Sequence, residues 1–212
     1  MDIKSLSILE ELDFSDISEI RELVLSNTDI AGNATPIFFE DLKYLENLEK
    51  LTIKKANISL EDYNYILKLN NLKDLRFYDC SIEDIVNLNE LKLNTLYLVN
   101  SYTNNLDVIS SVYSLKNVVL INHHLSSLSF LEGLNIEELH LVNCVIDDYS
   151  EFNHLRTIKY LFIDDSSIDD LSFLIEYEHL EHLSLDQKQY DNNPKIIELL
   201  NAKGTTVKVV KH

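Results

Sequence analysis

The stretch I-E-E-L-H-L-V-N-C-V-I, from Ile136 to Ile146, is one copy of a pattern that recurs along this 212-residue chain. Apolar residues occupy places 1, 4, 6 and 11 of the stretch, and a small residue occupies place 9. The same frame fits seven further segments, which begin at residues 20, 48, 72, 93, 115, 158 and 180. The copies therefore recur every 21 to 28 residues. Self-similarity at such a period is the signature of a stacked repeat architecture.

Each copy predicts one short strand at places 3 to 7, whose side chains point alternately into the core and out of it. One copy cannot bury its own apolar residues, whereas a stack of copies buries them in a continuous core behind a parallel sheet. A degenerate ninth copy with Val207 and Val209 ends the chain. We therefore expect an α/β solenoid of about eight repeats and one degenerate C-terminal strand, with a concave parallel sheet and short 3-10 or helical convex segments.

The second half of the copies often reads D-[LIY]-x-x-[LF], as in Asp169–Leu174 and Asp147–Phe152. From about residue 20 to 210 the pattern resembles the leucine-rich repeat family, in the short 21–22-residue class of bacterial internalins and a regulatory subunit of protein phosphatase 1. The resemblance implies a solenoid that binds other molecules through its shape. Place 9, where that family usually has Asn, holds Thr28, Ala56, Cys80, Ser101, His123, Cys144, Ser166 and Lys188. Asn or Asp stands instead at place 8, so we expect the backbone at this turn to be satisfied differently.

The ends of the stack need caps, because a terminal repeat would otherwise expose the core. We expect a single domain over residues 1–212, with an N-terminal cap at 1–19, repeats at 20–190 and a helix-strand cap at 191–212. Pro194 in the first turn of a helix and Gly204 at its end predict the C-terminal helix, before a strand at 207–210. Longer early repeats predict helices over 35–44 and over 59–68, the second opened by a capping box at Ser59.

Composition excludes several classes of partner. The chain has 18 basic and 36 acidic residues, a formal net charge of −18, and 45% apolar residues. Such a surface repels nucleic-acid phosphates and anionic membranes, so we expect neither as a partner. The N-terminal segment has no apolar signal-peptide core, and no apolar run approaches the ~18 residues of a membrane span, which favours the cytoplasm.

The two cysteines, Cys80 and Cys144, both stand at place 9, three copies apart. Three strand spacings of about 4.8 Å separate them by roughly 14 Å, too far for a disulfide. Free buried thiols are typical of a reducing compartment.

No motif in the sequence points to catalysis, and we predict no catalytic residue, cofactor or metal. The acidic pairs Asp147–Asp148 and Asp169–Asp170 recur at equivalent places, which favours turn chemistry on a solvated face. Seven histidines show no known metal-ligand spacing, and surface or turn positions account for them. A metal-dependent enzyme built on Asp147 and Asp169 is the remote alternative.

The outward-pointing places of the strands carry the most specific signal. Copies three to seven present apolar and aromatic residues there, where a solvated sheet face would be polar, and such a patch usually marks a protein interface. Its predicted contact residues are Arg76, Tyr78, Tyr97, Val99, Val119, Ile121, His140, Val142, Tyr160, Phe162, Asp164 and Asp186.

Charge is distributed unevenly along the repeats. Residues 43–79 carry a net +1, and residues 136–186 a net −11. We therefore expect a non-enzymatic module that captures a protein with a basic edge on its concave sheet. One concrete version is an immunity or inhibitor protein against a basic toxin or enzyme. The alternative is a regulatory subunit or scaffold for a cellular enzyme, and self-association through the same face stays open.

Overall fold

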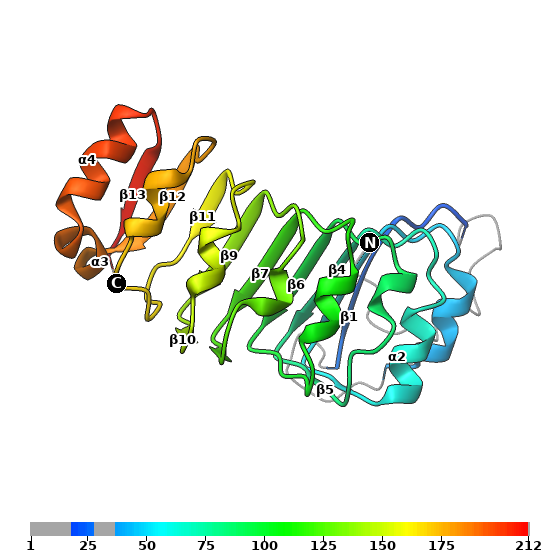
Figure 1. The fold of residues 1–212 in the computed structure, drawn as a ribbon. Helices are drawn as coiled ribbons and strands as arrows, with labels where there is room; N and C mark the ends of the chain where they lie inside the picture. Colours follow the sequence, from blue (N-terminus) through cyan, green and yellow to red (C-terminus); the bar gives the residue numbers. More distant parts are fainter. Residues whose placement is uncertain (1–17, 28–36, 212) are drawn as a thin grey trace. The chain divides into compact units, whose positions relative to one another are not determined.

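The structure is a computed structural model that describes residues 18–27 and 37–211. The chain divides into two compact units, Met1–Ser114 (unit 1) and Leu115–His212 (unit 2). Each unit is a stack of repeats with a parallel sheet on one side and short helical segments on the other (Figure 1). The prediction of one continuous domain stays a prediction. The predicted N-terminal cap lies outside the described residues, apart from Ser18 and Glu19.

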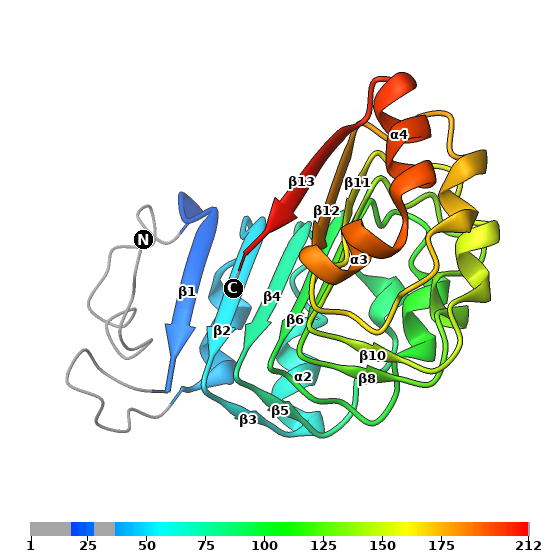
Figure 2. The same cartoon turned by 90° about the vertical axis from the view of Figure 1, so that its left-hand side faces the viewer.

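Unit 1 contains four strands that pair in parallel and in chain order: β1 (Glu22–Ser26), β2 (Lys50–Lys54), β4 (Asp74–Tyr78) and β6 (Thr95–Val99). A second, two-residue ladder joins β3 (Asn57–Ile58) to β5 (Ser81–Ile82), where the chain turns away from the main sheet (Figure 2). The opposite side is built from α2 (Leu60–Ile66) and the 3-10 helices η2 (Phe39–Tyr44), η3 (Leu88–Glu90) and η4 (Asp107–Ser111).

Unit 2 repeats this plan with five parallel strands: β7 (Asn117–Ile121), β9 (Glu138–Val142), β11 (Tyr160–Phe162), β12 (His182–Asp186) and β13 (Thr206–Val210). A short ladder joins β8 (His124–Leu125) to β10 (Val145–Ile146). The connecting segments are η5 (Ser129–Leu131), η6 (Ser150–Asn153), η7 (Ser172–Glu176), α3 (Gln187–Asn192) and α4 (Pro194–Ala202).

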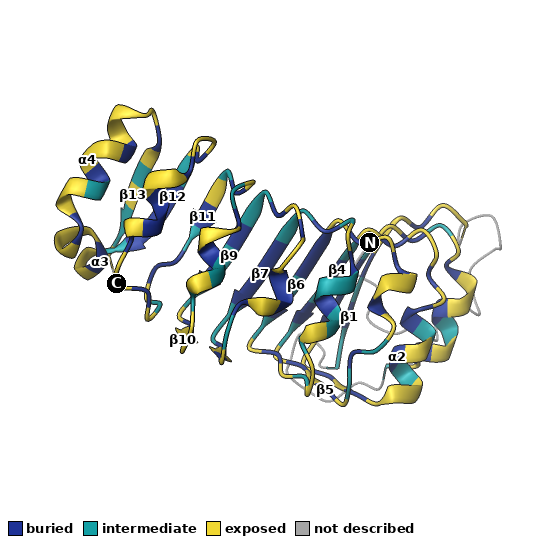
Figure 3. Ribbon diagram, viewed as in Figure 1, coloured by how far each residue is buried: buried dark blue, intermediate teal, exposed yellow. Residues whose placement is uncertain are grey.

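The core lies between the sheet and the helical segments of each unit, and places 4 and 6 fill it. In the copy that begins at Ile136, Leu139 and Leu141 are fully buried, and the equivalent residues of the other described strands up to β12 are buried as well. Figure 3 shows the helical segments exposed on their outer side. The repeat frame predicts the bounds of every main strand from β1 to β12 except β11, which ends two residues early. The predicted 3-10 convex segments are confirmed.

The helix signals of the sequence are confirmed where the structure describes them. Ser59 and Asp62 form the capping box of α2, with each side chain accepting from the other residue's backbone N–H. Pro194 opens α4, and Gly204 follows it with φ of 94°, a left-handed conformation that glycine adopts freely. The helix expected over 35–44 is a 3-10 helix from Phe39, and 28–36 lie outside the described residues.

Place 8 forms the corner after each strand, a role that the sequence analysis did not predict. Its residue has a left-handed backbone, with φ between 49° and 64°, in six copies: Lys55, Asp79, Asn100, Asn122, Asn143 and Asp165. Asn and Asp tolerate this conformation better than other side chains with a Cβ. The amides also link neighbouring copies, since Asn100 donates to Asp79 and Asn143 donates to Asn122.

The residue at place 9 turns inward at the same corner and is buried in five described copies, at Ala56, Cys80, Ser101, His123 and Cys144, whereas Lys188 at the equivalent place is exposed. The thiol of Cys80 donates to the carbonyls of Tyr78 and Ile53, at 3.3 and 3.5 Å. In unit 2 the thiol of Cys144 makes the equivalent bonds to Val142 and Leu120, both at 3.4 Å. Both thiols are free and buried, and burial raises the pKa of each.

We expect the left-handed corner to penalise β-branched residues. Asn143→Val should lower the free energy of unfolding by roughly 1–2 kcal/mol, because Val forces its Cβ against the carbonyl at positive φ. Asn143→Gly, which loses the same amide bond without that clash, should cost less. Urea denaturation of both variants checks this ordering, and a Gly variant at least as destabilised as the Val variant would contradict it.

We also expect both thiols to be unreactive while the chain is folded, because a buried thiol with a raised pKa supplies little thiolate. Ellman's reagent should label Cys80 and Cys144 slowly in buffer and both of them rapidly in denaturant. The control is a Cys144→Ser variant, in which Cys80 should react with the reagent as slowly in the folded chain as it does in wild type. Fast labelling of the folded chain would overturn the buried placement.

Candidate functional site

The candidate site lies on the sheet face formed by places 3, 5 and 7 of the strands, which we call the outer face. It points away from the helical segments in each unit (Figure 1). In unit 1 the predicted contact residues come from two adjacent strands, where Arg76 pairs with Tyr97 and Tyr78 pairs with Val99. All four side chains are half-buried, so the structure brings them together on an accessible surface.

Cations of unit 1 cover its tyrosines. The Arg76 guanidinium lies 4.1 Å from the centre of the Tyr97 ring, and Lys54 Nζ lies 5.8 Å from that of Tyr78. Arg76 is held in place by two 2.7 Å hydrogen bonds to the carboxylate of Asp74, which raise the pKa of the guanidinium. The outer face of unit 1 therefore combines aromatic rings with fixed positive charge.

The outer face of unit 2 begins with aliphatic residues. Ile121 and Val142 pair across β7 and β9 and remain half-exposed, as predicted. Val119 lies on the same face but only 2% of it is exposed. The side chain of Val119 is short and stands beside the larger His140, its partner in the ladder. Its burial differs from the expectation of an exposed contact residue.

Asp164 also differs from the expectation of an exposed carboxylate. It is only 7% exposed and accepts a 3.0 Å hydrogen bond from the hydroxyl of Ser184. Asp186 is half-buried and caps α3, accepting from the backbone N–H of Gln189 and of Asp165. Both carboxylates thus shape the turn after the strand, and Asp186 keeps part of its surface open.

Three rings form a continuous row on the outer face of unit 2. His140 stacks on Phe162 with ring centroids 3.9 Å apart and planes 12° from parallel. On the other side of Phe162, the ring of His182 follows at 5.2 Å and 39°. We call these three residues the ring row. The sequence predicted His140 and Phe162 as contact residues, whereas it gave no role to His182.

Acidic groups border the ring row. Glu138 Oε1 lies 2.7 Å from His140 Nε2. Tyr160 is 39% exposed, and its hydroxyl donates a hydrogen bond to Glu181 at 2.8 Å. This hydrogen bond raises the pKa of the phenol. Next to them, Glu137 pairs with Lys116 and Lys159 at 3.3 and 2.8 Å, and the pairs lower the pKa of Glu137.

The acidic pairs of the sequence serve as turn residues. Asp148 accepts from the backbone N–H of Ser150, and Asp170 from that of Ser172, both at 2.9 Å. The backbone bond lowers the pKa of Asp148. Within residues 18–27 and 37–211, no group of three or more His, Cys, Asp or Glu side chains could hold a metal ion. No helix in the described part of the chain is both long and apolar enough to cross a membrane.

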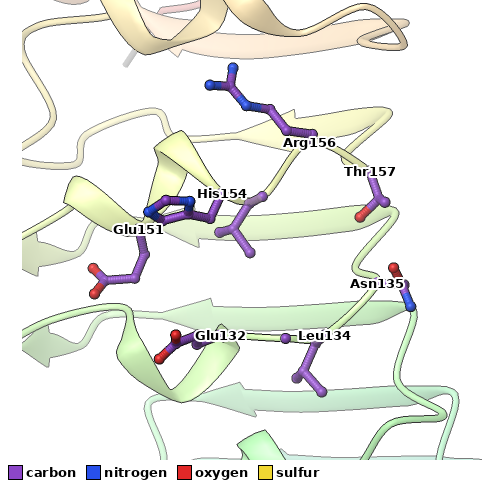
Figure 4. Close-up of a pocket in the computed structure, with 9 residues that line it drawn as sticks. Glu132, Leu134, Asn135, Glu151, His154, Arg156 and Thr157 are labelled. Carbon is purple, nitrogen blue, oxygen red and sulfur yellow. The ribbon is translucent and has the colours of Figure 1, made fainter.

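A pocket of about 320 Å³ opens in unit 2 between the segment from Glu132 to Asn135 and the segment from Glu151 to Thr157 (Figure 4). Glu151 Oε2 and Arg156 Nη1 are buried there without a hydrogen-bond partner. Leu134 and Leu155 supply its apolar wall. None of the residues predicted for binding lines this pocket, so it is separate from the outer face.

No family model matches this chain, and no curated protein matches its sequence. Solved structures do match it. An internalin from Listeria monocytogenes aligns with a TM-score of 0.66 and 21% identity, over 90% of this chain and 63% of that one. Internalin C2 of the same organism aligns with a TM-score of 0.62 and 22% identity, over 86% and 87% of the two chains.

A leucine-rich repeat protein of Leptospira interrogans aligns with a TM-score of 0.64 and 20% identity, over 99% of this chain and 54% of that one. A further match, with a TM-score of 0.58 and 16% identity, is a TLR13 structure in complex with a single-stranded RNA. The chain thus spans 63% of the first internalin and 54% of the Leptospira protein. At these identities the likeness concerns the fold. The chain therefore has the leucine-rich repeat fold, which both its repeat spacing and its solved neighbours display.

Proposed function

We propose that this chain is a non-enzymatic module that binds a protein partner on the outer face of its sheets. The observation that carries the proposal is the half-exposed apolar and aromatic surface of that face. Ile121, Val142 and Phe162 keep part of their surface open in unit 2, and Tyr78 and Val99 do so in unit 1. Adjacent apolar side chains on a rigid sheet are typical of an interface that another protein covers.

Charge supports a partner with a basic edge. The whole chain carries a net −18, and in unit 2 carboxylates border the apolar centre of the outer face. Such a field attracts a basic protein and orients it before contact, with a rate that falls as salt screens it. An inhibitor or immunity protein against a basic toxin or enzyme is the version of this function that the acidity favours most.

A regulatory subunit or scaffold is the second candidate, and the difference between the two units favours it. The outer face of unit 1 has cations on its tyrosines, whereas that of unit 2 has a ring row bordered by carboxylates. Two surfaces of different chemistry suit two different partners. An inhibitor should show one tight, salt-sensitive partner, whereas a scaffold should show several weaker ones.

Two buried free thiols are consistent with a reducing compartment, so we place this function in the cytoplasm. A partner made of nucleic acid is disfavoured by the charge, because acidic surfaces repel phosphates.

Capture from a native lysate tests the proposal. The bait is the full chain, compared with the double variant Ile121→Glu/Val142→Glu, which places two charges on the apolar part of unit 2's outer face. Wild type should retain a specific protein at 50 mM salt, and the variant should lose at least about 90% of it, because buried unpaired carboxylates oppose binding by several kcal/mol. Quantitative mass spectrometry of the eluates reads the result.

The matched control carries the same change of charge elsewhere in unit 2. Val145→Glu/Ile175→Glu replaces two aliphatic residues that are 53% and 40% exposed and lie off the outer face. It should retain the partner as wild type does, and circular dichroism should show all three baits folded. If both double variants retained the captured protein equally, the outer face of unit 2 would not be the binding surface.

A further inference from the structure

In the ring row, titratable side chains form part of the apolar surface of unit 2's outer face. Phe162 on β11 pairs with His140 on β9 in the ladder, and the ring of His182 on β12 lies diagonally across from Phe162. The centroid distances of 3.9 and 5.2 Å leave no space for another ring between them. A partner therefore meets the edges of the rings.

The charged and titratable neighbours of the row come from β9, β11, β13 and the segments beside β11 and β12. On β9, Glu138 lies 2.7 Å from the His140 ring. On β11, Tyr160 donates a hydrogen bond to Glu181, which precedes His182, and after β11 Asp164 is buried against Ser184. On β13, Lys208 pairs with Ser184 in the ladder, one strand from His182. The β7 residues paired with Glu138 and His140 are Asn117 and Val119, which do not titrate.

The surroundings of His182 favour its neutral form. Partial burial, the positive charge of Lys208 and the nearby His140 together lower its pKa below the ordinary value. Below that pKa, the His182 imidazole and Lys208 place positive charge on one side of the face. Above it, the same surface is apolar at its centre, with carboxylates at its border. Covering the row with a partner removes water from the His182 imidazole and so penalises its charged form further.

The border defines the chemistry that fits. Glu138 and Glu181 present carboxylates beside the exposed edges of Tyr160 and the ring row. An arginine side chain can lay its apolar stem along such edges while its guanidinium bonds the carboxylates. A protonated His182 would repel the guanidinium from the same spot.

We infer that the ring row of unit 2 anchors a basic, arginine-bearing segment of the partner, and that it holds this segment only while His182 is neutral. The inference rests on the proposed protein-binding function and adds the chemistry of the partner and its release on acidification.

The test uses the full chain and a fluorescein-labelled hexa-arginine peptide as the probe. Its anisotropy gives the Kd at pH 7.5 and at pH 5.5, at one fixed ionic strength. Wild type should bind about tenfold more weakly at pH 5.5, since the positive charge that His182 gains there repels the guanidinium. In His182→Gln the change should fall below about twofold, because the imidazole that repels the guanidinium is gone.

Two further variants locate the effect. His179→Gln removes an exposed histidine outside the outer face and should keep the tenfold change. Phe162→Leu keeps an apolar residue but removes the stacked ring, and should weaken binding at pH 7.5 by about five- to tenfold, the effect of an aromatic contact. His182→Asn, which also removes the imidazole, should lose the pH effect in the same way, and it keeps the test valid if His182→Gln does not fold.

Two results would overturn the inference. A pH effect of the same size in His182→Gln would assign the effect to carboxylates elsewhere. Binding that is unaffected by Phe162→Leu would place the peptide on another acidic surface, such as the turns at Asp147 and Asp169. The proposed function is tested separately by the lysate capture. A partner that wild type retains and Ile121→Glu/Val142→Glu loses would support that function even if its binding depended neither on pH nor on arginine.

Discussion

Every part of this structure depends on one constraint, which is that a single repeat cannot bury its own leucines. Leu139 and Leu141 are fully buried because the strands on either side, and the 3-10 segments behind them, exclude water from both. Burial of apolar side chains at about 25 cal/mol per Å² is the main favourable term in the folding of such a stack. The constraint fixes the register of the parallel strands, and with it the positions of all side chains on the outer face.

The corner after each strand follows from the same stacking. A chain that must return to the helical side within 21 or 22 residues turns sharply at place 8, and six residues there have positive φ. Place 9 then enters the core, where the Cys80 and Cys144 thiols bond to backbone carbonyls. The core and the corners use places 1, 4, 6, 8, 9 and 11, so the outward places of the strands remain available for binding chemistry.

Periodicity predicted the fold because the in-and-out alternation of a strand depends only on local geometry and on burial. The strand bounds, the capping box at Ser59 and the terminal helix between Pro194 and Gly204 all follow from local rules.

The exposure of side chains on the outer face does not follow from local rules, since it depends on neighbours one strand away. Val119 is covered beside His140, and Asp164 is held by Ser184, although both occupy outward places. His182 occupies place 3, an outward place that the pattern could have indicated, whereas the stacking of its ring on Phe162 depends on rotamers that the pattern does not determine. The recurrence of Asn and Asp at place 8 could also have predicted a left-handed backbone there, because these residues tolerate positive φ.

Hydroxyl-radical footprinting of the chain alone and in complex with its captured partner tests whether the outer face is the binding surface. Mass spectrometry reads the oxidation of each side chain in both states. We expect Tyr160 and Phe162 to be protected in the complex, while the exposed Tyr113 and Tyr102, which lie off the strands of the main sheets, are oxidised equally in both. Protection of Tyr102 or Tyr113 with unchanged oxidation of Tyr160 and Phe162 would contradict this expectation.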